Sequence, residues 1–276
     1  MEKSQIRHGH LTTPPSVLYC VAKPLSDCEI NVSEVTAPGE LPMHTVNCQV
    51  ISVHPLNHDI SLVQLRLPAG QRIRWHAGQY LMLNIDGDSY PFSIANACTD
   101  RDLTLHIRHD DANSAAIGIM ALLSTAATVS VTLPGGDRYI DRLPDRPVWF
   151  ICGSTGFAPV KAMIEHLQQH GFALPVRLFW GARQHPDIYM PDLPAHWQQS
   201  LKDFSAMTAL SENHHPDHAQ GLIHELALAE LDQPTEPLFY LGGSPAMAWA
   251  VFDALVAAGV PAHHIHSDVF DYAPRT

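Results

Sequence analysis

The chain has 276 residues, a formal net charge of −12 and 46% hydrophobic residues. This length suits two compact domains, and an acidic chain without a Lys/Arg cluster is a poor ligand for nucleic acid or an anionic membrane. No apolar run approaches the roughly 20 residues that span a bilayer. Residues 1–10 are polar and no apolar signal segment follows them, so we expect a cytoplasmic location.

The first half of the sequence predicts an antiparallel β domain. A Pro- and Gly-rich stretch at 36–42 is typical of a linker. Short alternating segments follow, separated by turn residues: TVNCQVISV, ISLVQLRLP, QYLMLNI, LTLHIRH and TVSVTLP. This pattern favours an antiparallel β-barrel or sandwich. One helical segment, Ser114–Leu123, interrupts it, with Ser114 available as the cap.

The second half alternates between strand and helix patterns. VWFIC predicts a buried strand, and PVKAMIEHLQQHG predicts a helix that ends on Gly171. Strands VRLFWGAR, FSAMTALSE, PLFYLGG and HIHSDVF and helices GLIHELALAEL and PAMAWAVFDALVAAG follow. This alternation predicts a doubly wound parallel sheet. We therefore expect a linker segment at 1–43, a β-barrel at 44–145 and an α/β domain at 146–276.

Two glycine turns in the α/β half point to a phosphate-bearing ligand. ICGSTGFAP leads from a buried strand into a helix, and YLGGSPAM follows a later strand of the same sheet. Glycines allow close approach of the backbone, and a helix N-terminus attracts anions. Turns at the carboxyl ends of parallel strands face one crevice. The first turn is not GxGxxG, and a plain glycine turn is the alternative interpretation.

Two further segments carry aromatic side chains. SYPFSIANA follows the barrel segment GQYLMLNI, and its alternation places Tyr90 and Phe92 on one face and Ser93 on the other. A core strand is the alternative. Near the C-terminus, SDVFDYA brings two aromatic residues just after the last predicted strand.

In this order, the motifs of residues 44–276 resemble those of the ferredoxin–NADP reductase superfamily. The nearest branches are the bacterial NAD(P)H–flavin reductases and the reductases similar to CDP-6-deoxyglucoseen reductase. The resemblance implies an antiparallel flavin-binding β-barrel followed by a doubly wound nucleotide-binding domain. It further implies hydride transfer from NAD(P)H to FAD or FMN, with the protein orienting the cofactors.

The resemblance also implies a set of site residues. The flavin would lie against the barrel strand, with Ser93 facing the reactive flavin nitrogen as the catalytic position. The nicotinamide nucleotide would lie on the two glycine turns, and Arg183 would meet the adenosine ribose, where it can pair with a 2′-phosphate; NADH against NADPH stays open. The cofactor-binding set is Tyr90, Pro91, Phe92, Ser93, Arg108, Ser114, Gly153, Ser154, Thr155, Gly156, Pro159, Arg183, Gly242, Gly243, Ser244, Pro245, Asp268 and Phe270.

Three departures from the family pattern matter. Tyr90 stands where the family usually has the Arg that binds a flavin phosphate, so a charge-assisted contact is lost. Gly242 replaces the usual Cys, which removes a thiol and leaves more room. The pyrophosphate region matches only loosely, with Arg108 and Ser114 as the remaining phosphate contacts. We therefore predict that the flavin is held weakly and is lost on dialysis.

Two functions compete. The first is an NAD(P)H-dependent reductase of free flavin or of an iron–sulfur or oxygenase partner. The second is a non-catalytic nucleotide-binding module that has lost its flavin, as Tyr90 suggests. A metalloenzyme is disfavoured: the 19 histidines are scattered, pairs such as His214–His215 are interpreted as solvated or packed, and neither HExxH nor CxxC occurs. The oligomeric state stays open.

The five cysteines are dispersed, which favours free thiols over disulfides. The segment around Cys20 resembles the region of the fourth ligand in a plant-type 2Fe–2S ferredoxin. Residues 1–43 are therefore interpreted as a ferredoxin remnant and linker. We expect no metal in this chain, and a 2Fe–2S cluster only in a longer parent protein that supplies the other cysteines. Reading the DNA in frame upstream of Met1 would decide between truncation and decay.

Overall fold

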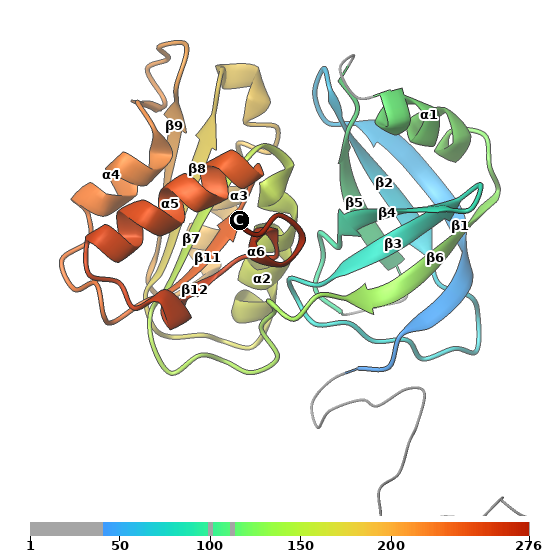
Figure 1. The fold of residues 1–276 in the computed structure, drawn as a ribbon, viewed down its shortest axis with the longest axis horizontal. Helices are drawn as coiled ribbons and strands as arrows, with labels where there is room; N and C mark the ends of the chain where they lie inside the picture. The colour runs from blue at the N-terminus through green and yellow to red at the C-terminus, as the bar shows by residue number, and fades with distance from the viewer. Residues whose placement is uncertain (1–40, 99–101, 111–113, 276) are drawn as a thin grey trace, which may run out of the picture. The chain divides into compact units, whose positions relative to one another are not determined.

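The computed structural model describes residues 41–98, 102–110 and 114–275. Cys20 and most of the predicted ferredoxin remnant lie outside the described residues and stay a prediction. Residues 41–276 form one unit, which contains an antiparallel sheet and a parallel sheet (Figure 1).

In the described part of the first half, six strands form one antiparallel sheet in the order β4-β3-β6-β1-β2-β5. A bridge between Ile94 and Leu105 joins the end of β4 to β5, so the two edge strands of the curled sheet meet. Leucine, isoleucine and valine side chains fill its interior. The strands are β1 His44–Pro55, β2 Ile60–Arg66, β3 Tyr80–Ile85, β4 Asp88–Ser93, β5 Asp102–Arg108 and β6 Thr128–Gly135.

The predicted helix of this half is confirmed at its predicted bounds, as α1 (Ser114–Leu123). Its buried residues are Ala116, Ile119 and Leu123, three and four residues apart. This spacing places them on one face of the helix. The face packs on the interior of the sheet, to which Ile119 and Leu123 belong.

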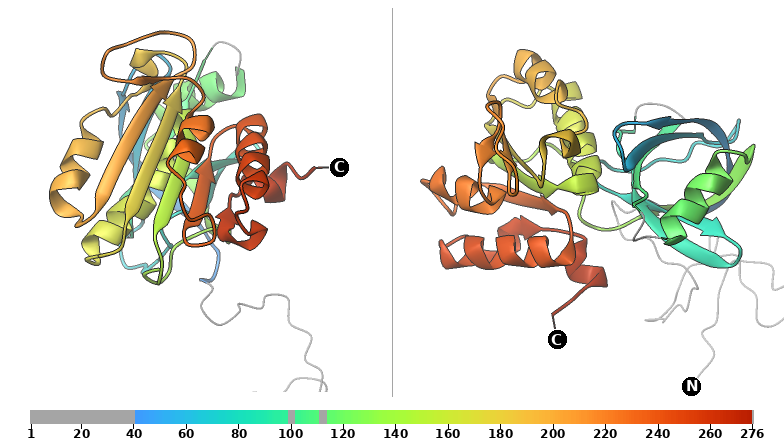
Figure 2. Two further views of the ribbon diagram at one scale, coloured as in Figure 1. Left: turned by 90° about the vertical axis from the view of Figure 1, so that its left-hand side faces the viewer. Right: turned by 90° about the horizontal axis from the view of Figure 1, so that it is seen from above.

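In the second half, six described strands form a parallel sheet in the order β10-β9-β8-β7-β11-β12. Helices α2 and α3 pack on one face and α4 and α5 on the other, so the predicted doubly wound sheet is confirmed (Figures 1 and 2). The elements are β7 Val148–Gly153, α2 Phe157–Gln169, β8 Val176–Ala182, α3 Leu193–Ser200, β9 Phe204–Leu210, β10 Ala219–Gln220, α4 Ile223–Ala229, β11 Leu238–Gly242, α5 Pro245–Ala257, β12 Ile265–His266 and α6 Val269–Tyr272.

The last predicted strand is wrong in its second half. The segment HIHSDVF pairs with the sheet only at Ile265 and His266, and α6 begins at Val269. Between them the Ser267 hydroxyl donates a hydrogen bond to the Leu241 carbonyl and accepts one from the Val269 N–H. The side chain thus turns the backbone away from the sheet.

The crossover helix α3 is absent from the sequence-based elements. Two parallel neighbours such as β8 and β9 need a long crossover, and α3 supplies it, with Pro194 in its first turn and Trp197 buried.

In the described residues no helix combines the length and apolarity that a membrane span requires. Cys48, Cys98 and Cys152 are free thiols, as expected.

Candidate functional site

The first glycine turn connects β7 to α2 through a short 3-10 helix, Ser154–Gly156. Ser154 has a φ of +50°, a backbone conformation that residues other than glycine rarely adopt. Phe157, the first residue of α2, stacks on Trp180 of β8 with ring centroids 3.8 Å apart. Both rings are fully buried, so the stack holds the N-terminus of α2 against the sheet.

The second glycine turn follows β11 and meets the first. A Cβ atom on Gly156 would lie 2.2 Å from the Gly242 carbonyl carbon, and one on Gly242 would lie 2.2 Å from the Gly156 carbonyl oxygen. The two backbones touch, so only glycine fits at either position. The space expected beside Gly242 is therefore filled by Gly156 and is not open to a ligand.

A cavity of about 410 Å³ opens at the carboxyl ends of β7, β8 and β9. The strand order reverses between β7 and β11, which is where ligands bind in open α/β sheets. Of the predicted site residues, the cavity is lined by Arg108, Gly153, Ser154, Arg183 and Ser244. Lining residues that the sequence analysis missed include Asp59, Asp187, Ser211, the segment 221–224 and Met247.

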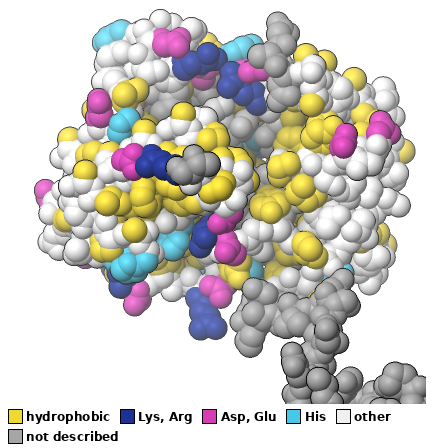
Figure 3. All heavy atoms as spheres, in the orientation of Figure 1, with side chains coloured by type: hydrophobic (Ala, Val, Ile, Leu, Met, Phe, Trp, Pro, Cys, Tyr) yellow, Lys and Arg dark blue, Asp and Glu magenta, His cyan; other side chains and the backbone are white. Residues whose placement is uncertain are grey.

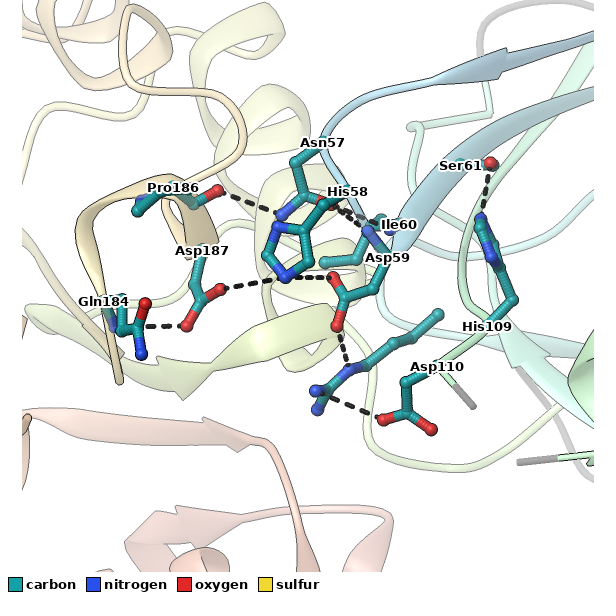
Figure 4. Close-up of polar contacts among 11 residues, drawn as sticks. Asn57, His58, Asp59, Ile60, Ser61, His109, Asp110, Gln184, Pro186 and Asp187 are labelled. Atoms are coloured by element: carbon teal, nitrogen blue, oxygen red, sulfur yellow. Dashed lines mark hydrogen bonds and ion pairs between the residues drawn. The ribbon is translucent and has the colours of Figure 1, made fainter. Parts of the chain in front are cut away.

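Arg108 lies at this cavity rather than in a separate phosphate site. Its Nε donates to Asp59 Oδ2 at 2.7 Å, and its Nη2 lies 3.2 Å from Asp110 Oδ2 (Figure 4). Asp59 is 8% exposed, so the guanidinium compensates a nearly buried carboxylate. Arg108 was expected to contact a flavin phosphate; two carboxylates already pair with it here.

Polar groups of the β1–β2 turn reach the loop after β8 beside this pair. Asn57 Nδ2 donates to the Pro186 carbonyl at 3.0 Å, and His58 Nε2 lies 3.7 Å from Asp187 Oδ1 (Figure 4). These contacts tie the antiparallel sheet to the rim of the cavity. Sequence reasoning had no signal for them, because the partners are more than 120 residues apart.

Lys161 of α2 makes a second link between the two halves. Its Nζ donates to the Ala95 carbonyl at 3.0 Å and pairs with Glu165 Oε1 at 2.6 Å. Ala95 comes two residues after Ser93, the predicted catalytic position. Lys161 therefore fixes the end of β4 relative to the helix that begins at the first glycine turn.

The predicted flavin strand is β4, an edge strand of the sheet. Tyr90 and Phe92 pack on the barrel interior as partly buried side chains, Ser93 is half-buried and Pro91 is exposed. The predicted alternation is thus found. Ser114 is the exposed first residue of α1.

The C-terminal residues Asp268 and Phe270 have different surroundings. Phe270 packs on Trp249 and Phe252 of α5, with centroids 4.5 and 5.2 Å apart. Asp268 Oδ1 is buried and has no hydrogen-bond partner among the described residues. It faces the turn after β6, where a Cβ on Gly136 would lie 3.4 Å from it.

The Asp268 carboxyl also has an unusual acidity. Burial, together with the carboxylates of Asp271 and Asp137, raises the pKa of Asp268 to about 7. Burial and the carboxylates of all three residues also raise the pKa of Tyr80 on β3. A carboxyl with one buried, unpartnered oxygen and a strongly shifted pKa is a candidate for a functional position.

Two family models match the chain, one for each half. Residues 45–134 match the model described as FAD-binding domain, and residues 150–253 match the oxidoreductase NAD-binding domain. Reductase component 2 of terephthalate 1,2-dioxygenase from Comamonas sp is 30% identical over 271 residues, covering 96% of this chain and 80% of that protein. The CDP-6-deoxy-L-threo-D-glycero-4-hexulose-3-dehydrase reductase of Yersinia pestis is 29% identical, covering 92% and 78%.

Solved structures show the same fold. The cytochrome P450 reductase GcoB of Amycolatopsis has a TM-score of 0.76 at 24% identity and covers 96% of this chain and 84% of its own. The ferredoxin reductase in carbazole 1,9a-dioxygenase has a TM-score of 0.73 at 22% identity, covering 97% and 85%.

Fold, cavity and family models together define an oxidoreductase built from an FAD-binding domain and an NAD-binding domain. More particularly, the chain belongs to the ferredoxin–NADP reductase superfamily. The relatives are named as reductases, so the enzyme is favoured over the non-catalytic module that the sequence left open.

Proposed function

We propose that this protein is the reductase component of a multi-protein redox system. It takes hydride from NAD(P)H onto FAD and passes the two electrons singly to an iron–sulfur or oxygenase partner. The donor becomes NAD(P)⁺, and the proton of the hydride is released as the electrons leave. FAD, when bound, supplies the conversion of one hydride into two single electrons.

The cavity at the glycine turns carries this proposal. Its lining combines the guanidinium group of Arg183 with the hydroxyls of Ser154, Ser211 and Ser244. Arg108 also lines the cavity, but Asp59 and Asp110 already pair with its guanidinium group. Cations, hydroxyls and the free N–H groups before a helix are the donors that a dinucleotide needs. The residues present therefore fit a nicotinamide nucleotide.

The residues proposed for the flavin are chemically suited to it. β4 offers the Ser93 hydroxyl on the face opposite Phe92, which packs on the barrel interior. Asp268 offers a buried carboxyl oxygen without a partner among the described residues. A flavin ring has polar edge atoms, which two such polar groups can bind. We propose that Ser93 and Asp268 orient the ring edge, and that Asp268 holds a proton near neutral pH.

The surface charges give no support for a nucleic-acid partner. In the face drawn in Figure 3, the Lys and Arg side chains are scattered and several lie beside Asp or Glu. Such a surface lacks the continuous basic stripe of a nucleic-acid-binding protein. The relatives named as dioxygenase reductase components support an iron–sulfur or oxygenase protein as acceptor.

Anaerobic mixing of the FAD-loaded protein with NAD(P)H tests the function. We expect the flavin absorbance to bleach and to recover when a ferredoxin is added. Because Tyr90 lacks the charge of an arginine, dialysis should remove most of the flavin from the wild type. Tyr90→Arg should retain more of it. Flavin that stays oxidised in the presence of both nucleotides would contradict the proposal.

Arg183 is proposed to set the coenzyme preference. It lies at the rim of the cavity, where it can pair with a 2′-phosphate. We expect Arg183→Ala to raise the KM for NADPH about tenfold or more, since a charge-assisted contact is lost, and to change the KM for NADH little. Steady-state kinetics with both coenzymes measures this, with the exposed Arg142→Ala as the matched control. Equal effects on the KM values of both coenzymes would show that Arg183 does not contact the 2′-phosphate of NADPH.

A further inference from the structure

Three histidines from two separate loops meet outside the predicted cofactor sites. His185 lies in the loop after β8, and His215 and His218 lie in the loop between β9 and β10. One ring nitrogen from each lies within 4.8 Å of the others. His214–His215 was interpreted from the sequence as solvated or packed, so this clustering is new information.

The contacts within the cluster bring one nitrogen of each ring close together. His185 Nδ1 lies 2.7 Å from His218 Nε2, and the rings of His185 and His215 stack with centroids 3.8 Å apart and 4° between their planes. The Asp217 backbone N–H donates to His215 Nδ1. Nε2 of His215 is therefore the nitrogen left for another partner.

Thr208 fixes the orientation of His218 from the strand beneath. Its Oγ1 lies 2.6 Å from His218 Nδ1. A hydroxyl that accepts from Nδ1–H holds the imidazole in the tautomer whose Nε2 lone pair faces His185 Nδ1. This outer contact is the arrangement by which proteins orient metal-binding histidines.

From this geometry we propose that His185, His215 and His218 bind one divalent transition-metal ion of the zinc class. Imidazole nitrogens suit zinc, copper, cobalt and nickel. Metal–nitrogen bonds of about 2.0–2.1 Å at tetrahedral angles place the nitrogens about 3.3 Å apart. Binding needs the pair at 2.7 Å to open slightly. It also needs one of the parallel rings of His185 and His215 to turn out of the stack, because imidazole lone pairs lie in the ring plane. The ion replaces the proton shared by His185 and His218, which moves to the outer ring nitrogen or to solvent.

The site joins two loops that border the dinucleotide cavity. Arg183 and Asp187 flank His185 in the first loop, and Ser211 precedes His215 and His218 in the second; Arg183, Asp187 and Ser211 all line the cavity. With three protein ligands, the fourth position is open to water. The ion would therefore cross-link the cavity rim without taking part in hydride transfer.

Metal titration tests the site directly. The full-length protein is stripped with a chelator and titrated with Co²⁺, followed by its absorption, and with Zn²⁺, followed by calorimetry. We expect one tight equivalent that is lost in His185→Ala and His215→Ala; both side chains are at least partly exposed, so the variants should fold, which thermal unfolding checks. Thr208→Val should weaken binding about tenfold or more.

The matched control uses another histidine pair. His166 and His170 on α2 have ring centroids 4.2 Å apart, so His170→Ala tests whether that pair is the binder. Binding that disappears in His170→Ala, or that is equal in wild type and the His185 and His215 variants, would overturn the proposal. NAD(P)H oxidation by the metal-free protein is measured in parallel. Its absence would count against the proposed function and leave the metal site to be judged by the titration.

Discussion

Replacing Asp268 by Asn is expected to stabilise the protein above pH 7 while slowing the reductase. The folded-state pKa is about 7, against an ordinary value of 3.8. Between these values the folded state holds a proton that the unfolded state has lost. The carboxyl therefore destabilises the fold progressively as pH rises from about 4 to about 7, and fully above pH 7.

The expected size is large for one side chain. A shift of about three pKa units corresponds to at most about 4 kcal/mol. Asp268 is partly exposed, and solvent screening reduces this to about 1–3 kcal/mol. The asparagine side chain carries no charge at any pH, so the gain in stability of Asp268→Asn should vanish near the ordinary carboxyl pKa of about 4.

Urea unfolding at a series of pH values measures this effect. Asp88→Asn, an exposed carboxyl in the β3–β4 hairpin, is the control and should change the free energy of unfolding little. Turnover should fall in Asp268→Asn alone, because a carboxyl retained at a cost in stability is expected to serve function. The interpretation fails if Asp268→Asn is no more stable than wild type at pH 8.

Restoring a side chain at Gly242 is expected to destabilise the protein strongly. In Gly242→Ala or Gly242→Cys, the new Cβ lies 2.2 Å from the Gly156 carbonyl oxygen. No rotamer change relieves a clash with backbone, so β11 and the first glycine turn have to separate. We expect a loss of about 2–4 kcal/mol and a raised KM for NAD(P)H. The thiol usual in the family therefore cannot simply be put back.

Substitutions at two other glycines serve as controls with smaller or opposite expected effects. In Gly153→Ala the Cβ meets the Met247 sulfur at 2.7 Å, and a flexible side chain can move aside. Its loss of stability should be smaller. Gly118 lies inside α1 with nothing within 4 Å, so Gly118→Ala should stabilise by about 0.5–1 kcal/mol. Equal urea midpoints for the Gly242 and Gly153 variants would refute the backbone clash.

The sequence by itself determined most of the local elements and their order, although it missed α3 and extended the last strand beyond His266. The bounds of α1 follow from its apolar spacing, the sheet class follows from the period of the segments, and Gly171 ends α2 with a φ of +66°. The glycine turns could be found because glycine is required wherever backbones approach closely. All these signals lie within one short window of chain, where periodicity and turn chemistry act.

The tertiary structure alone decided which distant side chains meet. Arg108 pairs with Asp59 across 49 residues, Phe270 turns to α5, and His185 stacks on His215 across a strand and a helix. Asp268 has its pKa because folding buries it beside two other carboxylates. Such pairings depend on sheet register and loop packing, which no local pattern encodes. The Arg108–Asp59 ion pair, the raised pKa of Asp268 and the histidine cluster could therefore be found only from the fold.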